Sequence, residues 1–296
     1  MRNRIRQSLP LLTLIIFLVS CSTYQVKRIS VPEDQLIPPR DNPNVLKLDS
    51  KKGELLYYGA IHSIDMKNSQ NTEIEKLWDS FQPTLAFSEG GVWPLEKNRY
   101  DAITKHGEQG LLRYLASRDN VPIESIDSTM RNQAIFLRRK YSPIEIKMYF
   151  VLIQTVINRR LERKTADVLY VTIILKSLAK ISLSKNIARN LGNYYNLDKN
   201  TPQNLEEFEY QMSKKFPEIR NWKDIPSSYF YDFRKGKFLP KIHQELNVFR
   251  DRLMLAKLVN KLKKSERILV VAGRSHLVRL EPSLHFWTQQ NKREER

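Results

Sequence analysis

Hydrophobic positions along the chain fall into short continuous runs separated by longer amphipathic segments. Four runs have the length and composition of buried strands. They are ELLYYGA at 54–60, TLAFSEGG at 84–91, VPIESID at 121–127 and RILVVAGRSH at 267–276. Helical segments between such runs predict parallel pairing, because a parallel crossover needs a dozen or more residues. The pattern therefore predicts an α/β fold with a mixed or mainly parallel central sheet flanked by helices.

Three segments between and beside the strands have helical periodicity. Residues 71–81 begin with Thr72 as a predicted N-cap and Glu75 in the capping-box position. Residues 108–120 form a second helical segment, and residues 241–265 form a third with a continuous apolar stripe. The members of that stripe are Ile242, Leu246, Phe249, Leu253 and Ala256, and Arg250 lies beside it.

The middle of the chain, residues 142–235, predicts a helical insertion into the α/β domain. Ser142 is the expected N-cap of its first helix, Pro143 the first helical residue, and Glu145 completes a capping box. An aromatic-rich connector follows, with Trp222, Tyr229, Phe230 and Tyr231. Two interpretations stay open for these aromatic side chains: a lid over a site, or ordinary packing under a long loop.

The N-terminus has the three parts of an export signal. Arg2, Arg4 and Arg6 are positively charged, and Leu9–Val19 is too short for a transmembrane helix, which needs about 20 apolar residues. The sequence Leu-Val-Ser-Cys that ends at Cys21 resembles the bacterial lipobox. We therefore predict a signal peptide at 1–20, a membrane-lipid anchor on Cys21, a proline-containing tether at 21–52, and one domain at 53–296. The alternative is that residues 1–20 are a short uncleaved membrane anchor and that Cys21 is incidental.

Charge and cysteine content narrow the class of partner. The formal net charge is +18, and removal of three leader arginines leaves +15 (18 minus 3). A basic surface favours anionic partners, and export makes nucleic acid an unsuitable one. The single cysteine permits no disulfide once it is lipidated. Ser22 after it is not the aspartate of inner-membrane retention, so we expect a cell-envelope location, with the outer membrane favoured over the inner.

Three predicted strands end in ionisable side chains. His62 follows LLYYGAI, Glu89 follows TLAFS and His276 follows ILVVAGRS. Both histidines stand three residues after a glycine, Gly59 or Gly273, and we expect each to project from a loop. Because ligands bind at the carboxyl ends of parallel strands, we expect these groups to share one site. Each also has an ordinary structural interpretation: a hydrogen-bonded histidine, or a carboxylate at a helix N-terminus.

The order of four motifs resembles the superfamily of TraB, GumN, the Tiki metalloproteases, the erythromycin esterases and the ChaN haem-binding lipoproteins. The motifs are GAIH, FSEGG, RDRLM and VVAGRSH, within residues 54–91 and 248–282. The resemblance implies a pocket lined by His62, Glu89, Arg250 and His276, and a fold of two related halves. The chain departs from the family pattern at Arg274-Ser275 and at Asp127, which leaves the substrate open.

Three kinds of function follow from the resemblance and the residues. A hydrolase would use an imidazole as general base with Arg250 on an oxyanion, or a divalent metal held by His62, Glu89 and His276. A binding lipoprotein would hold haem or another iron ligand, with Tyr57, Tyr58 and Tyr100 as candidate neighbours. A non-catalytic envelope protein would use the fold alone. The ligand, a small molecule or a peptide, is not specified by the sequence.

Overall fold

The computed structural model describes residues 44–50, 52–160, 175, 202, 204–264 and 266–293. The predicted leader, Cys21 and most of the tether lie outside these residues, so the expectations for them stay predictions. Among the residues described, the helices are too short or too polar to cross a membrane.

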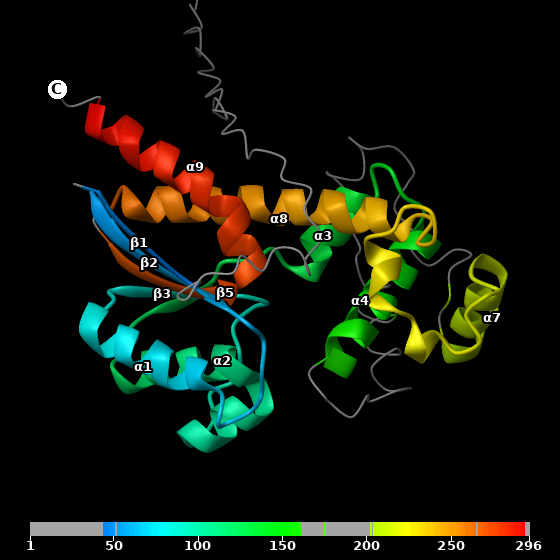
Figure 1. Cartoon of the computed structure of the whole chain (residues 1–296), viewed down its shortest axis with the longest axis horizontal. Coiled ribbons are helices and arrows are strands. Elements are labelled where there is room, and N and C mark those ends of the chain that lie inside the picture. The colour runs from blue at the N-terminus through cyan, green and yellow to red at the C-terminus, as the bar shows by residue number, and fades with distance from the viewer. Residues whose placement is uncertain are drawn as a thin grey trace, which may run out of the picture.

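The core of the fold is a five-stranded sheet of order β1-β2-β5-β3-β4. Only β1 runs antiparallel to its neighbour; β2, β5, β3 and β4 are parallel. This confirms the predicted α/β fold with a mixed, mainly parallel sheet (Figure 1). The strands are β1 Val45–Ser50, β2 Gly53–Ala60, β3 Leu85–Ser88, β4 Ile123–Ser125 and β5 Arg267–Gly273.

Strand β1 corrects the predicted tether, which was expected to reach residue 52. Its side chains alternate: Leu46 and Leu48 are buried, whereas Lys47 and Asp49 are exposed. That alternation is typical of a strand at a sheet edge with one face on the core. Residues 45–50 of the predicted tether are therefore part of the sheet.

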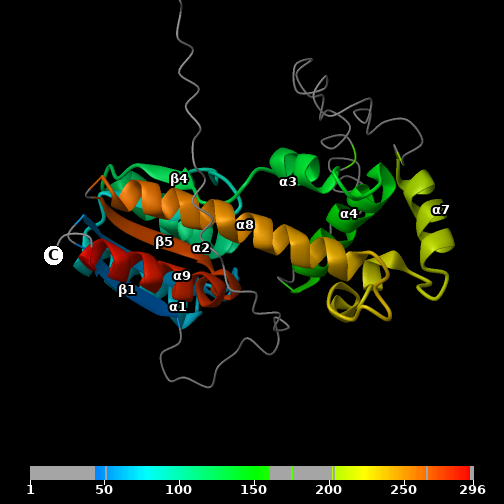
Figure 2. The same cartoon turned by 90° about the horizontal axis from the view of Figure 1, so that it is seen from above.

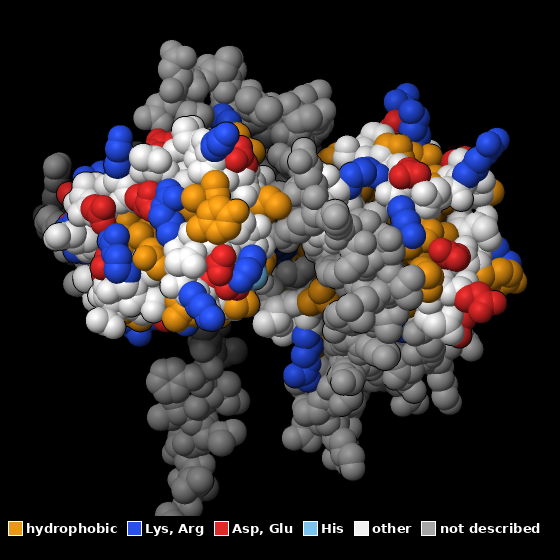
Figure 3. Space-filling model, turned by 90° about the horizontal axis from the view of Figure 1, so that it is seen from below, with side chains coloured by type: hydrophobic (Ala, Val, Ile, Leu, Met, Phe, Trp, Pro, Cys, Tyr) orange, Lys and Arg blue, Asp and Glu red, His pale blue; other side chains and the backbone are white. Residues whose placement is uncertain are grey.

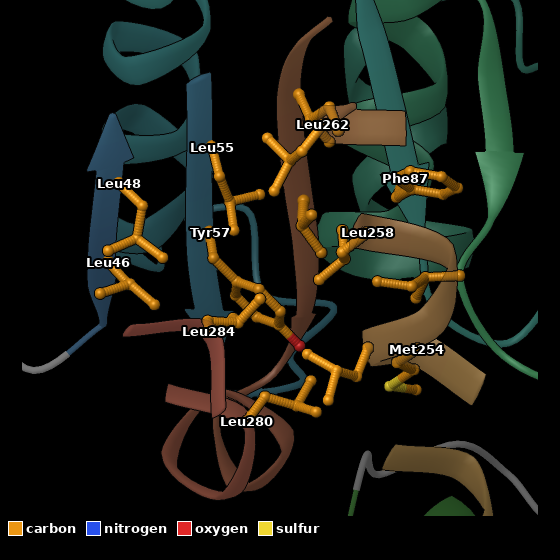
Figure 4. Close-up of a cluster of buried hydrophobic side chains, with 14 of the residues drawn as sticks. Leu46, Leu48, Leu55, Tyr57, Phe87, Met254, Leu258, Leu262, Leu280 and Leu284 are labelled. Carbon is orange, nitrogen blue, oxygen red and sulfur yellow. The ribbon is translucent and has the colours of Figure 1, made fainter. Parts of the chain in front are cut away.

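Helices cover both faces of the sheet, as Figures 1 and 2 show. Helices α1 and α2 pack on one face and α8 and α9 on the other. Figure 4 shows the core on the α8 and α9 side, where Leu55 and Tyr57 of β2 meet Leu258 and Leu284. The helices are α1 Ser69–Phe81, α2 Arg99–Arg118, α3 Met130–Leu137, α4 Pro143–Arg160, α7 Leu205–Lys215, α8 Leu239–Leu262 and α9 Arg274–Arg293, with short 3₁₀ turns η1 Trp222–Asp224 and η2 Ser227–Phe230.

The N-cap prediction for α1 was wrong. The cap is Asn68, whose side chain accepts a hydrogen bond from the backbone N–H of Gln70, and Thr72 lies inside the helix. The earlier start is fixed by Gln70, whose amide group bonds both the N–H and the C=O of Ile61. These two hydrogen bonds connect the start of α1 to the segment that carries His62.

The middle of the chain builds a second core, which we call the helical lobe. Helices α3, α4 and α7, the two 3₁₀ turns and the first half of α8 surround it. Trp222 and Phe230 are buried there, and Tyr229 and Tyr231 pack against it. The packing interpretation of these aromatic residues is therefore confirmed and the lid interpretation is wrong.

Helix α8 belongs to both cores. Its first half supplies Leu239, Ile242 and Leu246 to the helical lobe, and its second half packs on the sheet through residues such as Leu258 and Leu262. Arg250 and Asp251 lie between the two halves, at the level where the sheet ends. Figure 1 shows α8 running from one part of the molecule to the other.

Candidate functional site

The carboxyl ends of β2, β3 and β5 meet at the edge of the sheet that faces the helical lobe (Figure 1). Two of the predicted groups follow β2 and β3 directly in extended or loop segments, namely His62 and Glu89. His276 was expected in a loop as well, and that expectation was wrong. Strand β5 ends at Gly273 and α9 begins at Arg274, so His276 stands in the first turn of a helix.

The structure brings the three predicted groups together around Glu89. The Nε2 atom of His62 lies 3.9 Å from Oε2 of Glu89, and the Nε2 atom of His276 lies 3.4 Å from Oε1. The two histidines therefore approach the carboxylate from opposite sides of the sheet: His62 from the α1 and α2 side, His276 from the α9 side.

Both glycines of the Gly-x-x-His motifs are required by close approach rather than by a turn. The backbone N–H of Gly273 donates to Oε2 of Glu89 at 2.5 Å. A Cβ atom at residue 273 would lie 3.1 Å from that oxygen and 3.2 Å from Nε2 of His62. At Gly59 a Cβ atom would lie 2.9 Å from the side chain of Leu277 and 3.1 Å from Cα of Arg274. Gly59 therefore admits α9 onto the sheet, and Gly273 admits the two reactive side chains.

Glu89 is held as an anion by several donors. Arg250 donates from Nη2 to its Oε1 at 2.6 Å, and the Gly273 backbone N–H donates to its Oε2 at 2.5 Å. Burial alone would raise the pKa of the Glu89 carboxyl, but the charges of His276 and Arg250 outweigh burial and hold this pKa well below its ordinary value. Glu89 is therefore a fixed negative charge and a poor proton acceptor.

Arg250 joins Glu89 to the neighbouring strand end. Its guanidinium makes two parallel bonds to Asp127, from Nε at 2.9 Å and from Nη2 at 2.6 Å. Asp127 follows β4 and is 7% exposed, so its charge requires such a partner. The departure from the family pattern at this position thus supplies the second carboxylate of a Glu89–Arg250–Asp127 network.

His276 is part of a second network, between Glu89 and Asp251. Its Nδ1 lies 2.5 Å from Oδ1 of Asp251, and Asp251 also accepts from Nε of Arg279 at 2.5 Å. Burial and Arg250 lower the pKa of His276, yet Glu89 and Asp251 outweigh them, and the net shift is upward. His276 is only 3% exposed. It is a buried imidazole whose protonated form is favoured by two neighbouring carboxylates.

His62 has a different environment, with a partner that the sequence did not reveal. Its Nδ1 lies 2.6 Å from Oε1 of Glu108, while the His62 side chain is 37% exposed and that of Glu108 only 3%. Glu108 also accepts from the Ser63 backbone N–H at 3.4 Å. A buried carboxylate on Nδ1 orients an imidazole and directs Nε2 outward, toward the edge of the sheet where Glu89 lies.

A kink in α2 is what delivers Glu108. Gly107 has φ +64°, a left-handed conformation inside the helix, and a Cβ atom there would lie 2.5 Å from the Ser63 carbonyl. Glycine therefore lets α2 press against the segment after His62. The sequence HGEQG at 106–110, a carboxylate between two glycines of a helix, was the available signal.

The residues do not fit a metal ion. The described part of the chain holds no group of three or more His, Cys, Asp or Glu arranged for one. Both oxygens of Glu89 already accept from Arg250 and from the Gly273 N–H, and both ring nitrogens of His276 lie against carboxylates, Nδ1 against Asp251 and Nε2 against Glu89. The predicted set of His62, Glu89 and His276 forms a site, but an ion-paired one.

The tyrosines proposed as haem neighbours are mostly inaccessible. Tyr57 and Tyr58 point to opposite faces of the sheet and are 0% and 2% exposed. The Tyr58 hydroxyl donates to Glu73 at 2.8 Å. Tyr100, on α2, is 63% exposed. The assignment of Tyr57 and Tyr58 as ligand neighbours was therefore wrong, because strand alternation buries both in the two cores.

Arg274 was expected to add a cation beside the pocket. It is the first residue of α9, and its backbone lies against Gly59.

Comparisons with family models, with curated proteins and with solved structures find no match for this chain.

Proposed function

We propose that the chain is an envelope-anchored lipoprotein with a hydrolase-like site in which His62 is the general base. The observation that carries this proposal is the pairing of a half-buried imidazole with a buried carboxylate, His62 with Glu108, at the carboxyl ends of parallel strands. Among the three groups predicted from the sequence, only His62 combines solvent access with a ring nitrogen directed toward the site edge. The reaction class is acyl transfer to water, as in ester or amide hydrolysis.

In this mechanism His62 accepts a proton from water at Nε2 while the water oxygen attacks the substrate carbonyl. Glu108 stabilises the imidazolium that forms, because its carboxylate bonds Nδ1 at 2.6 Å. The proton then passes from Nε2 to the leaving group as the tetrahedral intermediate collapses. Such proton transfer contributes roughly 10²- to 10⁴-fold to the rate.

The charges around Glu89 have a positioning role in this mechanism. Arg250 and His276 are tied to carboxylates on both sides, and their side chains are only 19% and 4% exposed. They hold Glu89 ionised 3.9 Å from His62 Nε2, where its negative charge stabilises the imidazolium that forms during the reaction. This differs from the expectation that Arg250 stabilises an oxyanion.

The test is turnover on a panel of activated esters and amides. The wild-type chain should hydrolyse at least one member, His62→Ala should abolish that turnover, and Glu108→Gln should lower it by about 10²-fold or more. In Glu108→Gln the pH profile should also change, because a neutral amide does not stabilise the imidazolium. Turnover retained in His62→Ala ends the proposal, and so does a wild type that is inert across the panel, which favours a non-catalytic envelope protein.

A matched control exists on α9. His285 and Glu281 form an exposed imidazole–carboxylate pair, with Nε2 of His285 3.7 Å from Oε1 of Glu281. His285→Ala and Glu281→Gln should leave turnover unchanged. Incubation with a chelator should likewise have no effect, whereas a loss of turnover that added zinc restores would contradict a metal-free site.

The envelope anchor is a separate part of the proposal. It is supported by the lipobox-like sequence before Cys21 and by the basic n-region. Mass spectrometry of the mature chain should find Cys21 at the N-terminus, carrying a diacylglyceryl group and an amide-linked acyl chain. Cys21→Ser should remove the modification. An unprocessed N-terminus in the wild type would contradict this part and leave the site proposal untouched.

A further inference from the structure

We propose that the outer end of the helical lobe carries a docking surface for anionic lipid headgroups, independent of the His62 site. We call it the basic face. It is formed by the end of α7 and by the segment that leads into α8. Its members are Tyr210, Lys214, Lys215, Phe233, Arg234, Lys235 and Lys237.

Contacts between side chains and backbone make the basic face one continuous surface. Lys237 donates to the carbonyl of Lys215 and lies 4.8 Å over the ring of Phe216. Lys215 in turn lies 5.6 Å over the ring of Phe238, and the rings of Phe216 and Phe238 are 5.7 Å apart. Lys215 and Lys237 are 22 residues apart in sequence, and these contacts hold their two segments together.

The helix dipole accounts for only part of the positive charge of this surface. Lysines in the last turn of α7 are favoured by the helix dipole, which accounts for Lys214 and Lys215. Arg234, Lys235 and Lys237 are exposed and lie outside any helix. Within the part of the chain that the structure describes, the acid paired with them is Asp232, which bonds Arg234 at 3.2 Å. Five bases and one acid give the basic face a formal charge of +4.

Exposed aromatic side chains select a lipid surface among anionic partners. Phe233 is 55% exposed in the middle of the basic segment, and Tyr210 is 56% exposed with Lys214 lying 4.3 Å over its ring. Aromatic residues flanked by lysines are typical of protein surfaces at membrane interfaces, where the ring enters the headgroup layer and the ammonium groups meet phosphates. A surface for a soluble anion alone would gain nothing from an exposed phenylalanine.

The basic face lies far from the sheet. Figures 1 and 2 both show α7 at the end of the molecule opposite the sheet, with the start of α8 beside it. Figure 3 shows that Lys, Arg and hydrophobic side chains are mixed over both parts of the molecule, so net charge alone does not define a surface. What distinguishes the basic face is the combination of clustered bases with exposed rings.

The test measures partition of the full chain, carrying Cys21→Ser, onto lipid vesicles. The vesicles are phosphatidylcholine with or without phosphatidylglycerol, at low ionic strength. We expect tighter binding to the anionic vesicles and a decrease with added salt. The triple variant Lys214→Gln, Lys235→Gln, Lys237→Gln should lower partition onto anionic vesicles roughly 100-fold, at roughly fivefold for each lysine near the surface. Phe233→Ser should lower it roughly tenfold.

The matched control removes the same charge from the sheet side of the molecule. Lys76, Lys97 and Lys264 are exposed there, and their triple change to Gln should alter partition by less than about threefold. An equal loss in both triple variants would overturn the proposal in favour of diffuse charge. Equal binding of the wild type to neutral and anionic vesicles would overturn it in favour of the apolar leader. A triple variant that loses binding to a single-stranded oligonucleotide but keeps binding to vesicles would assign the basic face to nucleic acid.

Discussion

His62 and Glu89 face each other across a glycine: Nε2 of the one and Oε2 of the other, 3.9 Å apart, both lie within van der Waals reach of where a Cβ of residue 273 would be. Gly273→Ala should therefore push the two groups apart and reduce turnover at least about tenfold, because a misplaced base loses its geometry. The free energy of unfolding should change less in Gly273→Ala than in Gly59→Ala. A fully active Gly273→Ala would show that the 3.9 Å approach is not used in the reaction.

Gly59→Ala tests the other glycine by stability. The added methyl would meet the side chain of Leu277 and the backbone of Arg274, so α9 must shift off the sheet. We expect a loss of about 1–3 kcal/mol in the free energy of unfolding, measured by urea denaturation. A neutral Gly59→Ala would mean that α9 repositions without cost.

Removal of the shared cation should destabilise the fold. Arg250→Met removes the salt bridge of the buried Asp127 and leaves Glu89 with only His276 and the Gly273 N–H, at a cost of about 3–5 kcal/mol in urea denaturation. Adding Asp127→Asn to this variant should restore part of the loss. Arg252→Met, an exposed position of the same helix, should stay within about 0.5 kcal/mol of wild type. A small loss in Arg250→Met would show that water solvates both carboxylates.

Stability should depend on pH on both sides of a maximum. The pKa values of Glu89 and Asp251 are lowered, so their contributions are lost as pH falls from their ordinary values of 4.5 and 3.8 through the folded ones. The pKa of His276 is raised, so its contribution is complete below 6.5 and is lost as pH rises through the folded value. His276→Gln should remove the decline on the alkaline side, which urea unfolding across a pH series measures. His285→Gln, an exposed position of the same helix, should keep that decline.

A buried hydroxyl lies directly behind the charged cluster. The Tyr57 hydroxyl has no hydrogen-bond partner among the described residues, and burial together with Glu89 and Asp251 raises its pKa. Tyr57→Phe should therefore stabilise the chain by about 1 kcal/mol, since a buried unsatisfied hydroxyl is costly. Tyr58→Phe, which removes the bond to Glu73, should destabilise by about the same amount. Destabilisation by Tyr57→Phe would indicate an ordered water on that hydroxyl.

The strand ends were predictable because parallel strands present their carboxyl ends at one edge. That rule alone was enough to expect His62, Glu89 and His276 at one site, whereas Arg250 was added only by the resemblance of the RDRLM motif. The side on which each histidine emerges was not predictable. It depends on α9 beginning immediately after β5, which turns His276 inward onto Asp251.

Glu108 was not predicted because the burial of a helical carboxylate depends on tertiary contacts. In sequence it resembles any exposed helical glutamate, and only the kink at Gly107 brings it within reach of His62. Strand β1 escaped for a different reason. Its alternation of buried and exposed residues is clear, but the nearby prolines suggested an extended tether.

Helix α8 is 24 residues long and continuous, with Arg250 and Asp251 near its midpoint. One end is embedded in the helical lobe and the other in the sheet core. One helix therefore carries the residues of both salt-bridge networks of Glu89 at the point where the two cores meet. A change in the angle between the helical lobe and the sheet would move Arg250 and Asp251 together. A force on the helical lobe would then alter the bonds to Glu89, Asp127 and His276 at the same time.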